Sequence, residues 1–360
     1  MSRQARALID LDAIRANYRL ACAQSPQSQA VAIVKADAYG HGATRVAAAL
    51  EPEVPAFGVA CIEEAIALRE AGITRPILLL EGFFQPDELP IIVEQNFWTA
   101  LHSEHQIDQI AALPESAGLH VWLKMDSGMH RLGVAPEHYA DAFRRLKALP
   151  QVAEVVLMSH FACADELDND FTRVQIERFR QATEGLDAPV SLANSPATLG
   201  WPQARQDLMR PGLMLYGASP FGQPQVEADK LQPAMTLLSE VIAVREIEPG
   251  ESVGYACTWT ADQPSRVGTV AMGYGDGFPR HAKNGTPVLI DGQRSRIIGR
   301  VSMDMLTVDL TDLPQAGLGS TVEFWGANLS INEVAPWCDT IPYTLMTCLT
   351  GRIPRIYRGD

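Results

Sequence analysis

The chain lacks the features that mark several large classes of protein. Its 360 residues contain no run of 18 apolar residues, so no segment could span a bilayer as a helix. The N-terminal sequence MSRQARALIDLD has no apolar core of the kind found in signal peptides. Neither GxGxxG nor GxxxxGK[ST] occurs, which leaves the chain without a dinucleotide-binding or P-loop signature. A formal net charge of −14 disfavours nucleic acid and anionic membranes as partners.

Cysteine pairs and metal-ligand clusters are also missing. The six cysteines are scattered along the chain with no CxxC pair. We therefore expect free thiols in a reducing, cytoplasmic setting. His102 and His105 lie three residues apart in HSEHQ, but no further ligands cluster near them. We expect no metal site, and we interpret this segment as an exposed helix start.

The first two thirds of the chain contain a repeating pattern of strands and helices. With 47% hydrophobic and 20% charged residues the chain is globular, and its length of 360 residues suggests two domains. Amphipathic segments such as IEEAIALREAG separate most of the short apolar runs. Eight runs favour a (β/α)8 barrel over an open doubly wound sheet, since the Gly-rich phosphate loop is missing. The runs are VAIVK (31–35), AFGVA (56–60), ILLLE (77–81), FWTAL (97–101), HVWLKM (120–125), VVLMSH (155–160), VSLAN (190–194) and LMLYG (213–217).

The pattern changes near residue 230. Segments such as SRVGTVAMGY and STVEFWG are rich in β-branched residues, and Gly and Pro punctuate them at close spacing. This pattern predicts a mostly antiparallel β domain. With FGQPQVEADKLQP (221–233) as the linker, we expect a barrel domain over residues 1–230 and a β domain over residues 231–360. A short strand expected before the barrel, within ARALIDLD, could pair with either domain.

One apolar run ends in a lysine that marks the candidate site. In VKADAYGHG (34–42), Lys35 follows the expected strand and Tyr39 comes four residues later. Barrel folds carry their chemistry at the C-terminal ends of the strands. Because lysine is costly to bury, a lysine at the tip of an apolar strand often has a shifted pKa or a covalent partner. The Lys35 amine is therefore a candidate nucleophile that forms a Schiff base with a carbonyl, including the aldehyde of pyridoxal phosphate. Either residue alone would more often be a solvated or packing side chain.

Polar side chains also follow other expected strands. Each one alone has an ordinary structural explanation, such as an ion pair, a helix cap or a buried histidine. A barrel would gather them into one mouth, and their recurrence at five strand ends favours a shared site. They are Lys35, Lys124 with Arg131, His160, Asn194 with Ser195, and Arg210.

Several of these groups indicate a particular cofactor. Ser195 at a helix start, and Gly212 with the next backbone N–H, suit a phosphate. Arg210 beside the pyridine nitrogen of pyridoxal phosphate would keep that nitrogen unprotonated, because two adjacent cations are unfavourable. This would weaken the electron sink and favour proton exchange over bond-breaking side reactions. In the β domain, Tyr255 could act as a base only if donors or cations such as His160 and Arg210 stabilise its phenolate.

Eight motifs together resemble those of the alanine racemase family. VKADAYGHG is highly specific for that family, and KMDSGMHRLG, SHFACAD, NSPAT, RPGLMLYG, GYACTW, GYGDG and RVSMDM follow in the expected order. The resemblance implies a pyridoxal-phosphate-dependent isomerase that interconverts L-alanine and D-alanine. It also implies a head-to-tail homodimer with two shared active sites, producing D-alanine as a peptidoglycan precursor. The sequence leaves open a role in degrading L-alanine instead.

The resemblance implies specific roles at the reacting centre. Lys35 would hold the cofactor as an internal aldimine and act as the base on the D-alanine side. Tyr255 of the partner subunit would be the opposite base, acting on L-alanine. Arg210 would contact the pyridine nitrogen, and His160 would link Arg210 to that tyrosine. The phosphate would be held by Tyr39, Ser195, Gly212, Leu213 and Tyr343.

Further roles concern the substrate. Arg131 would lie beside the phenolic oxygen of the cofactor and help bind the substrate carboxylate. A carbamylated Lys124 would orient Arg131. Met303 of the partner subunit would bind the carboxylate through its backbone. The entrance would be lined by Asp165, Tyr274 and Arg280.

Three other functions remain open on the residues alone. An amino-acid decarboxylase of the same architecture would typically carry a Gly-rich phosphate loop and an acid at the pyridine nitrogen, so Arg210 argues against it. A non-catalytic pyridoxal-phosphate carrier would lack the β domain, and it would leave Tyr255 and Tyr343 unexplained. A cofactor-free aldolase that uses Lys35 would leave the phosphate-binding residues without a role.

Overall fold

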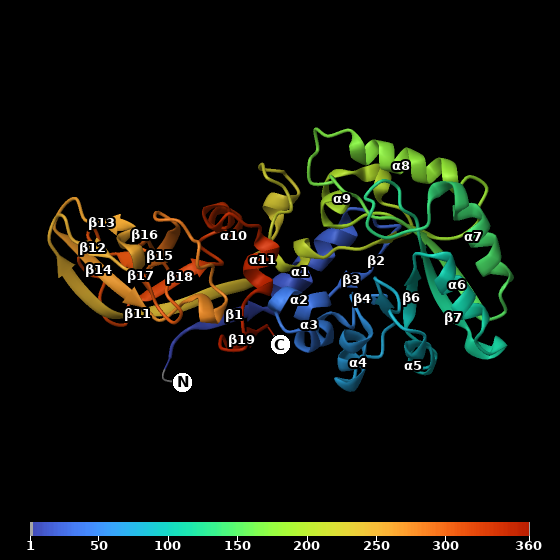
Figure 1. Ribbon diagram of the computed structural model, residues 1–360, viewed down its shortest axis with the longest axis horizontal. Coiled ribbons are helices and arrows are strands. Elements are labelled where there is room, and N and C mark those ends of the chain that lie inside the picture. Colours follow the sequence, from blue (N-terminus) through green and yellow to red (C-terminus); the bar gives the residue numbers. More distant parts are fainter. Residues whose placement is uncertain (1–2, 360) are drawn as a thin grey trace.

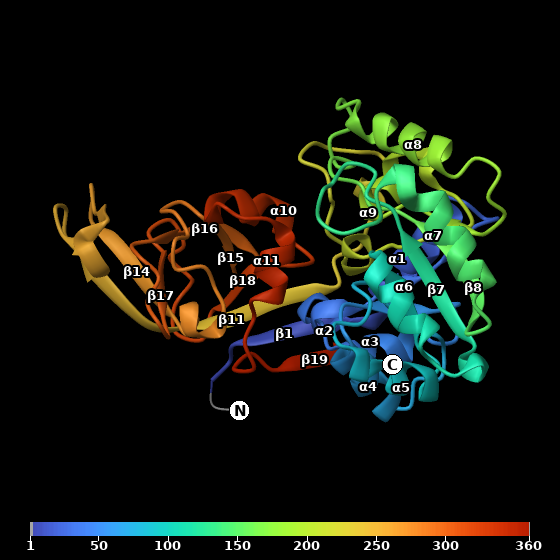
Figure 2. The same ribbon diagram turned by 45° about the vertical axis from the view of Figure 1, so that its right-hand side comes forward.

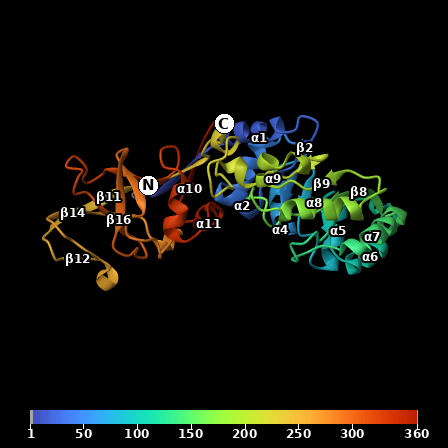
Figure 3. The same cartoon turned by 90° about the horizontal axis from the view of Figure 1, so that it is seen from above.

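The computed structural model describes residues 3–359 and has two lobes, a parallel barrel and a mostly antiparallel β lobe (Figure 1). The fold class expected from the sequence is confirmed. The lobes lie end to end along the long axis, and the view from above shows the same separation (Figure 3).

The barrel lobe contains nine strands, and every neighbouring pair is parallel. They are β2 (Gln29–Ala30), β3 (Ala32–Ile33), β4 (Phe57–Val59), β5 (Ile77–Leu79), β6 (Trp98–Leu101), β7 (Leu119–Lys124), β8 (Val152–Met158), β9 (Val190–Ser191) and β10 (Leu208–Met209). β2 and β3 are halves of one strand interrupted at Val31. Because β2 pairs with β10 and β3 pairs with β4, the sheet closes on itself as an eight-stranded barrel.

Helices cover the outside of this barrel. They are α1 (Leu11–Ala23), α3 (Ala43–Leu50), α4 (Ile62–Glu70), α5 (Leu89–Glu94), α6 (Glu104–Ala111), α7 (Pro136–Ala148), α8 (Phe171–Ala182) and α9 (Ser195–Gly200). The short α2 (Lys35–Gly40) lies instead at the mouth of the barrel and lines the cavity there. α7 shows why these segments are helical. A proline stands at its first turn, where its missing N–H is not needed. It buries Tyr139, Phe143 and Leu146, whose spacing of four and three places them on one helix face.

One expected strand is wrong. The run Leu213–Tyr216 forms a short 3-10 helix, η4, and the eighth barrel strand is β10, which ends four residues earlier. The N–H groups of Gly212 and Met214 donate to the Ser195 hydroxyl oxygen instead of to a neighbouring strand. All four residues of η4 are buried, so their apolar character matches that of a buried strand.

The β lobe follows the barrel. Its strands and helices are β11 (Met235–Ile247), β12 (Ser252–Val253), β13 (Trp259–Thr260), β14 (Ser265–Val270), β15 (Pro287–Ile290), β16 (Gln293–Ile298), β17 (Leu306–Asp309), β18 (Thr321–Trp325), α10 (Ile331–Val334), α11 (Pro342–Thr347) and β19 (Arg355–Arg358). The main sheet runs β14-β17-β16-β15-β18-β11-β1-β19. A further pairing of β11 with β14 closes part of it into a second, antiparallel barrel.

The first strand of the chain belongs to the β lobe. β1 (Arg6–Asp10) pairs antiparallel with β11 and parallel with β19. Figure 2 shows these three strands side by side where the lobes meet. Both ends of the chain are therefore hydrogen-bonded into the β lobe, and β1 continues directly into α1 of the barrel lobe.

All six cysteines are free thiols. Within residues 3–359, no helix has the length and apolar character needed to cross a bilayer.

Asp10 lies at the junction between β1 and the first helix of the barrel lobe. Its carboxylate accepts a hydrogen bond from the N–H of Ala13 at 2.9 Å, which caps α1, and one from Arg358 Nε at 3.1 Å. We expect Asp10→Ala to lower the free energy of unfolding by about 1–2 kcal/mol, measured as a lower urea midpoint. Asp10→Asn keeps the cap and loses only the exposed ion pair, so its loss should stay below about 1 kcal/mol. Equal losses in the two variants would contradict the role of the cap.

Candidate active site

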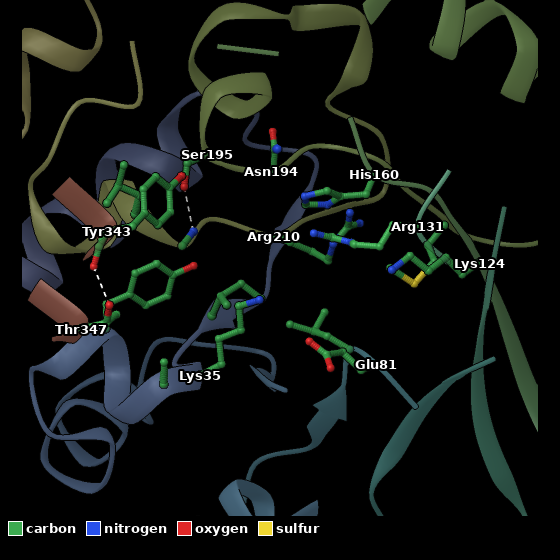
Figure 4. A pocket seen from close by; sticks show the side chains of 17 residues that line it. Lys35, Glu81, Lys124, Arg131, His160, Asn194, Ser195, Arg210, Tyr343 and Thr347 are labelled. Atoms are coloured by element: carbon green, nitrogen blue, oxygen red, sulfur yellow. Dashed lines mark hydrogen bonds between the residues drawn. The ribbon is translucent and has the colours of Figure 1, made fainter. Parts of the chain in front are cut away.

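The C-terminal ends of the barrel strands open into a cavity of about 300 Å³, which is within the range of small-molecule sites. Tyr343 and Thr347 of α11 bring the β lobe to one side of it (Figure 4). Most residues expected at the site line this cavity. They are Lys35, Tyr39, Lys124, Arg131, His160, Ser195, Arg210, Gly212, Leu213 and Tyr343.

A strained turn carries Lys35 into the cavity. Lys35 comes two residues after β3, and residues 36–39 have φ of 52° to 54° with ψ of 40° to 52°. These angles form a left-handed helical turn, which costs roughly 1–2 kcal/mol for each residue other than glycine. Such strain persists only where the surrounding structure enforces it, and it clusters at functional sites. Here the turn directs both Lys35 and Tyr39 to the cavity.

His41 helps to hold this turn. Its Nδ1 lies 3.0 Å from the carbonyl oxygens of both Ala38 and Tyr39, so Nδ1 carries the proton. Burial lowers the pKa of His41 to about 4, and the ring is neutral at physiological pH. The carboxylate of Asp37 adds a bond of 2.7 Å from the N–H of Ala43. The sequence reasoning assigned His41 no role, although it belongs to the VKADAYGHG motif.

Tyr39 is packed tightly at the end of the turn. Its ring stacks on Tyr216 at 4.8 Å and lies 5.8 Å from the ring of Tyr343. Burial, followed by the neighbouring Tyr343, raises the pKa of Tyr39, and burial raises the pKa of Tyr343 to about 12. Both hydroxyls therefore keep their protons and can donate hydrogen bonds. A Cβ on Gly212 would lie 2.5 Å from the Tyr39 hydroxyl, so only glycine allows this approach.

Ser195 forms the opposite wall of the same corner. It begins α9, whose N-terminus is capped by the side chain of Asn194. Its hydroxyl oxygen accepts hydrogen bonds from the N–H groups of Gly212 at 2.8 Å and Met214 at 3.3 Å. These two bonds leave the hydroxyl proton to be donated to a ligand. With the hydroxyls of Tyr39 and Tyr343, this corner offers several neutral donors to an anion.

Arg210 is a fixed cation, only 4% exposed. Its terminal nitrogens donate to the backbone oxygens of Ser191, Leu192 and Ser159 and to the Ser191 hydroxyl, at 2.5–3.2 Å. Burial lowers the pKa of Arg210 to about 10, which leaves it charged at neutral pH. These bonds hold the guanidinium in one orientation against the cavity.

A second group of cations lies nearby. Lys124 is 7% exposed at the end of β7, and Arg131 follows on the next loop. Burial lowers the pKa of Lys124 to about 8, with further lowering from the charges of Arg210 and Arg131. A substantial fraction of Lys124 is therefore a neutral amine near pH 8.

Two histidines near these cations, His102 and His160, have lowered pKa values. Burial, followed by the charges of Arg210 and Lys124, lowers the pKa of His160 well below its usual value, so its ring is neutral. The interpretation of HSEHQ as an exposed helix start holds for His105 but is wrong for His102. His102 is half-buried at the end of β6, and burial, followed by the charge of Lys124, lowers its pKa.

Tyr255 lies outside the cavity of its own chain. It begins the short 3-10 helix η6 (Tyr255–Cys257) between β12 and β13, and it is 67% exposed. Figures 1 and 3 show β12 at the end of the β lobe that is remote from the barrel. A single chain therefore does not bring Tyr255 to Lys35.

The remaining expected residues also lie outside this cavity. Met303 is 53% exposed on the β lobe, and its carbonyl oxygen accepts a hydrogen bond from the residue after Tyr274. The Arg280 guanidinium lies 6.0 Å from the centre of the Tyr274 ring. Asp165 is exposed on the barrel lobe, and its charge contributes to the raised pKa of Tyr343 after burial, which places it near the cavity.

Glu81 is the main lining residue that the sequence reasoning missed. It stands two residues beyond β5 and lines the cavity with Lys35 and Lys124. A signal was present, because ILLLE ends in a charged residue just as VAIVK does. Asn194 was expected at the mouth with Ser195 and also lines the cavity. Other lining residues without an assigned role are Ile33, Ala36, Leu80, Met158 and Thr347.

Comparison with known proteins identifies the family. The N-terminal domain model of alanine racemase matches residues 9–220, and the C-terminal domain model of alanine racemase matches residues 234–357. The chain belongs to the alanine racemase family. The catabolic alanine racemase of Pseudomonas putida is 57% identical over 358 residues, which cover 99% of this chain and all of that relative.

Solved structures agree with this assignment. The biosynthetic alanine racemase from Pseudomonas aeruginosa matches with a TM-score of 0.96 and 47% identity, over 99% of this chain and 100% of that one. An alanine racemase from Bartonella henselae with covalently bound pyridoxal phosphate matches with a TM-score of 0.91 and 30% identity, over 99% of each chain. The enzyme is a pyridoxal-phosphate-dependent isomerase that interconverts L-alanine and D-alanine, as the motifs predicted.

The cavity fits this cofactor. The Lys35 amine is available for the aldehyde, and Arg210 offers a fixed cation. The corner at Gly212 suits a phosphate, since it combines donors from Ser195 and Tyr39 with a space that a Cβ would fill. A cavity with this set of donors matches an aldehyde at one end of a ligand and a phosphate at the other.

The left-handed turn should lower the stability of the protein, because alanine is unfavourable at a positive φ. Ala36 is exposed and has φ of 52°, so Ala36→Gly removes the steric cost while adding backbone entropy to the unfolded chain. We expect a net gain of up to about 1 kcal/mol in the free energy of unfolding, measured by urea denaturation.

The matched control is Ala48→Gly, at an exposed position within α3. There the alanine is already in a favourable conformation, so the change should cost about 0.5–1 kcal/mol. A similar loss in both variants would show that residue 36 stores no strain.

Proposed function

We propose that the enzyme exchanges the α-proton of alanine with two bases, Lys35 of one chain and Tyr255 of the partner subunit. When bound, pyridoxal phosphate supplies an electron sink that acidifies the α-carbon. Lys35 then removes or returns the proton on the D-alanine side. Tyr255 of the partner subunit does so on the opposite face, for L-alanine. Two bases on opposite faces are needed because one base would return the proton to the face it came from.

The position of Tyr255 supports a shared site. Its phenol is 67% exposed and remote from the Lys35 of its own chain. A head-to-tail homodimer would let each β lobe complete the other chain's cavity. Such an interface would bury apolar side chains that are exposed on the β lobe. They include Tyr255, Met303, Met305, Trp337 and Ile341.

The cofactor phosphate is assigned to the corner described above. Tyr39, Ser195 and Tyr343 would donate through their hydroxyls, and Gly212 and Leu213 through their backbone N–H groups. Arg210 would face the pyridine nitrogen and keep it unprotonated, because its guanidinium stays charged and cannot turn away from its carbonyl partners. His160, held neutral by burial, would link Arg210 to Tyr255 of the partner subunit.

The substrate carboxylate is assigned to Arg131 and to the backbone of Met303 of the partner subunit. Lys124 would be carbamylated and would orient Arg131. Its lowered pKa of about 8, caused mainly by burial, supports this role because only the neutral amine reacts with carbon dioxide. Asp165, Tyr274 and Arg280 would line the entrance.

The proposal also covers the domain boundaries, the cellular location and the use of the product. Residues 1–230 would form the cofactor-binding domain, apart from β1, which pairs within the sheet of the β lobe, and residues 231–360 would form the β domain. Family matches that end at 220 and start at 234 support this division. The free thiols support a cytoplasmic location. The product D-alanine would serve as a peptidoglycan precursor, and loss of the gene should then create a requirement for external D-alanine.

The role of Tyr255 is tested by Tyr255→Phe. Removing the phenol should lower the racemisation rate about 10²–10⁴-fold, the usual contribution of one acid–base group. The near-visible absorbance of the bound cofactor should remain, because Lys35 and the phosphate corner are intact. A variant with wild-type activity would refute the two-base assignment.

The shared site is tested by mixing two inactive variants, Lys35→Ala and Tyr255→Phe. Random exchange makes half of the dimers mixed, and each mixed dimer has one intact site, so about a quarter of wild-type activity should return. As a matched control, Lys35→Ala mixed with Arg210→Ala should stay inactive, since both changes lie in the barrel lobe and no intact site can form. No recovery in the first mixture, with subunit exchange demonstrated, would place both bases in one chain.

A further inference from the structure

The cavity contains one carboxylate among many cations. Lys35, Lys124, Arg131 and Arg210 line it together with Glu81. Within residues 3–359, no Lys, Arg or His nitrogen lies within 4.0 Å of the Glu81 carboxylate, so it is committed to no ion pair. Figure 4 shows Glu81 at the cavity wall with Lys35 on one side and Lys124 on the other.

Glu81 and Lys124 belong to neighbouring parts of the barrel. β5, β6 and β7 are adjacent in the sheet, and Glu81, His102 and Lys124 stand at their respective C-terminal ends. The electrostatic neighbours of Lys124 come from several strand ends and loops around the mouth. They are Lys35, Glu81, His102, Arg131, His160 and Arg210. Among these groups only Glu81 can carry a negative charge.

We propose that Glu81 controls how much of Lys124 is carbamylated, by shifting the pH and the carbon dioxide pressure at which the modification is half complete. The inference rests on the proposed modification of Lys124 and specifies its regulation. In the reaction, the lone pair of the neutral Lys124 amine forms a bond to the carbon of carbon dioxide. One N–H proton leaves to water, and the product is an anionic carbamate.

Glu81 opposes this reaction in two ways. Its charge stabilises the ammonium form of Lys124, which cannot react, against the lowering of the pKa by burial and by Arg210 and Arg131. It also repels the carbamate, which the same arginines attract. The balance between one carboxylate and the surrounding cations therefore sets the fraction modified.

The effect would reach the substrate through Arg131. A carbamate on Lys124 would orient Arg131 for the substrate carboxylate, whereas the ammonium form would repel it. Glu81 is therefore a positioning residue, and its influence should appear in KM for alanine more than in kcat.

The test measures the carbamate directly. Holoenzyme is equilibrated with ¹³C-labelled carbon dioxide at a fixed pressure, and the carbamate signal is followed by ¹³C NMR across a pH series. Glu81→Gln removes the charge with little change in shape. We expect the pH of half-modification to fall by about one unit relative to wild type, and KM to become less sensitive to carbon dioxide.

Three variants make the result specific. Glu81→Asp keeps the charge and should resemble wild type, which a purely structural role of the glutamate would not predict. Glu94→Gln makes the same charge change at the exposed end of α5 and should have no effect. Lys124→Arg should abolish the signal, which assigns it to this lysine.

Each outcome is decisive. A pH of half-modification that is equal in wild type and Glu81→Gln overturns the inference while leaving the modification of Lys124 in place. No carbamate in either protein at any pressure overturns both. A carbamate that forms only in Glu81→Gln supports the inference and shows that Glu81 suppresses the modification.

Discussion

The cost of burying several cations at one barrel mouth is the constraint on which the site depends. Burial and neighbouring charges bring the pKa of Lys124 to about 8, and burial brings that of Arg210 to about 10. Among residues 3–359, no carboxylate lies within 4.0 Å of the charged nitrogens of Lys35, Lys124, Arg131 or Arg210. Instead, the protein orients Arg210 through carbonyl oxygens and leaves the mouth suited to anions. A phosphate and a carboxylate are the groups that would complete it, which is the charge pattern of pyridoxal phosphate with an amino acid.

The backbone that follows Lys35 is strained. Residues 36–39 adopt a left-handed turn that an ordinary strand-to-helix connection would avoid. His41 holds the turn from within, and α11 packs against it from the β lobe, since a Cβ on Gly40 would lie 2.3 Å from the carbonyl oxygen of Met346. The pairing of β1 with β11 and β19 fixes that lobe relative to the barrel. The position of Lys35 is therefore a property of both lobes.

The same architecture keeps part of the β lobe away from the mouth of its own barrel. The β lobe extends away from its own barrel and carries Tyr255 and Met303 to exposed positions. In the proposed dimer, joining two chains would bring Tyr255 and Met303 to the partner's mouth and would cover apolar surface in one step. It would also mean that neither chain alone holds a complete set of acid–base groups, so activity would depend on association.

The sequence by itself determined the barrel, the β lobe and most of the cavity lining. A buried strand is visible in a short apolar run, and parallel strands in a barrel must end at one mouth, so Lys35, Lys124, His160 and Arg210 could be grouped before any coordinates. Local pattern was wrong at Leu213–Tyr216, because a buried 3-10 helix and a buried strand have the same apolar character. Only the tertiary structure decided that Glu81 faces the cations, that His102 is half-buried, and that Tyr255 lies far from Lys35. These facts depend on contacts between segments distant in sequence, and no single segment carries information about its distant neighbours.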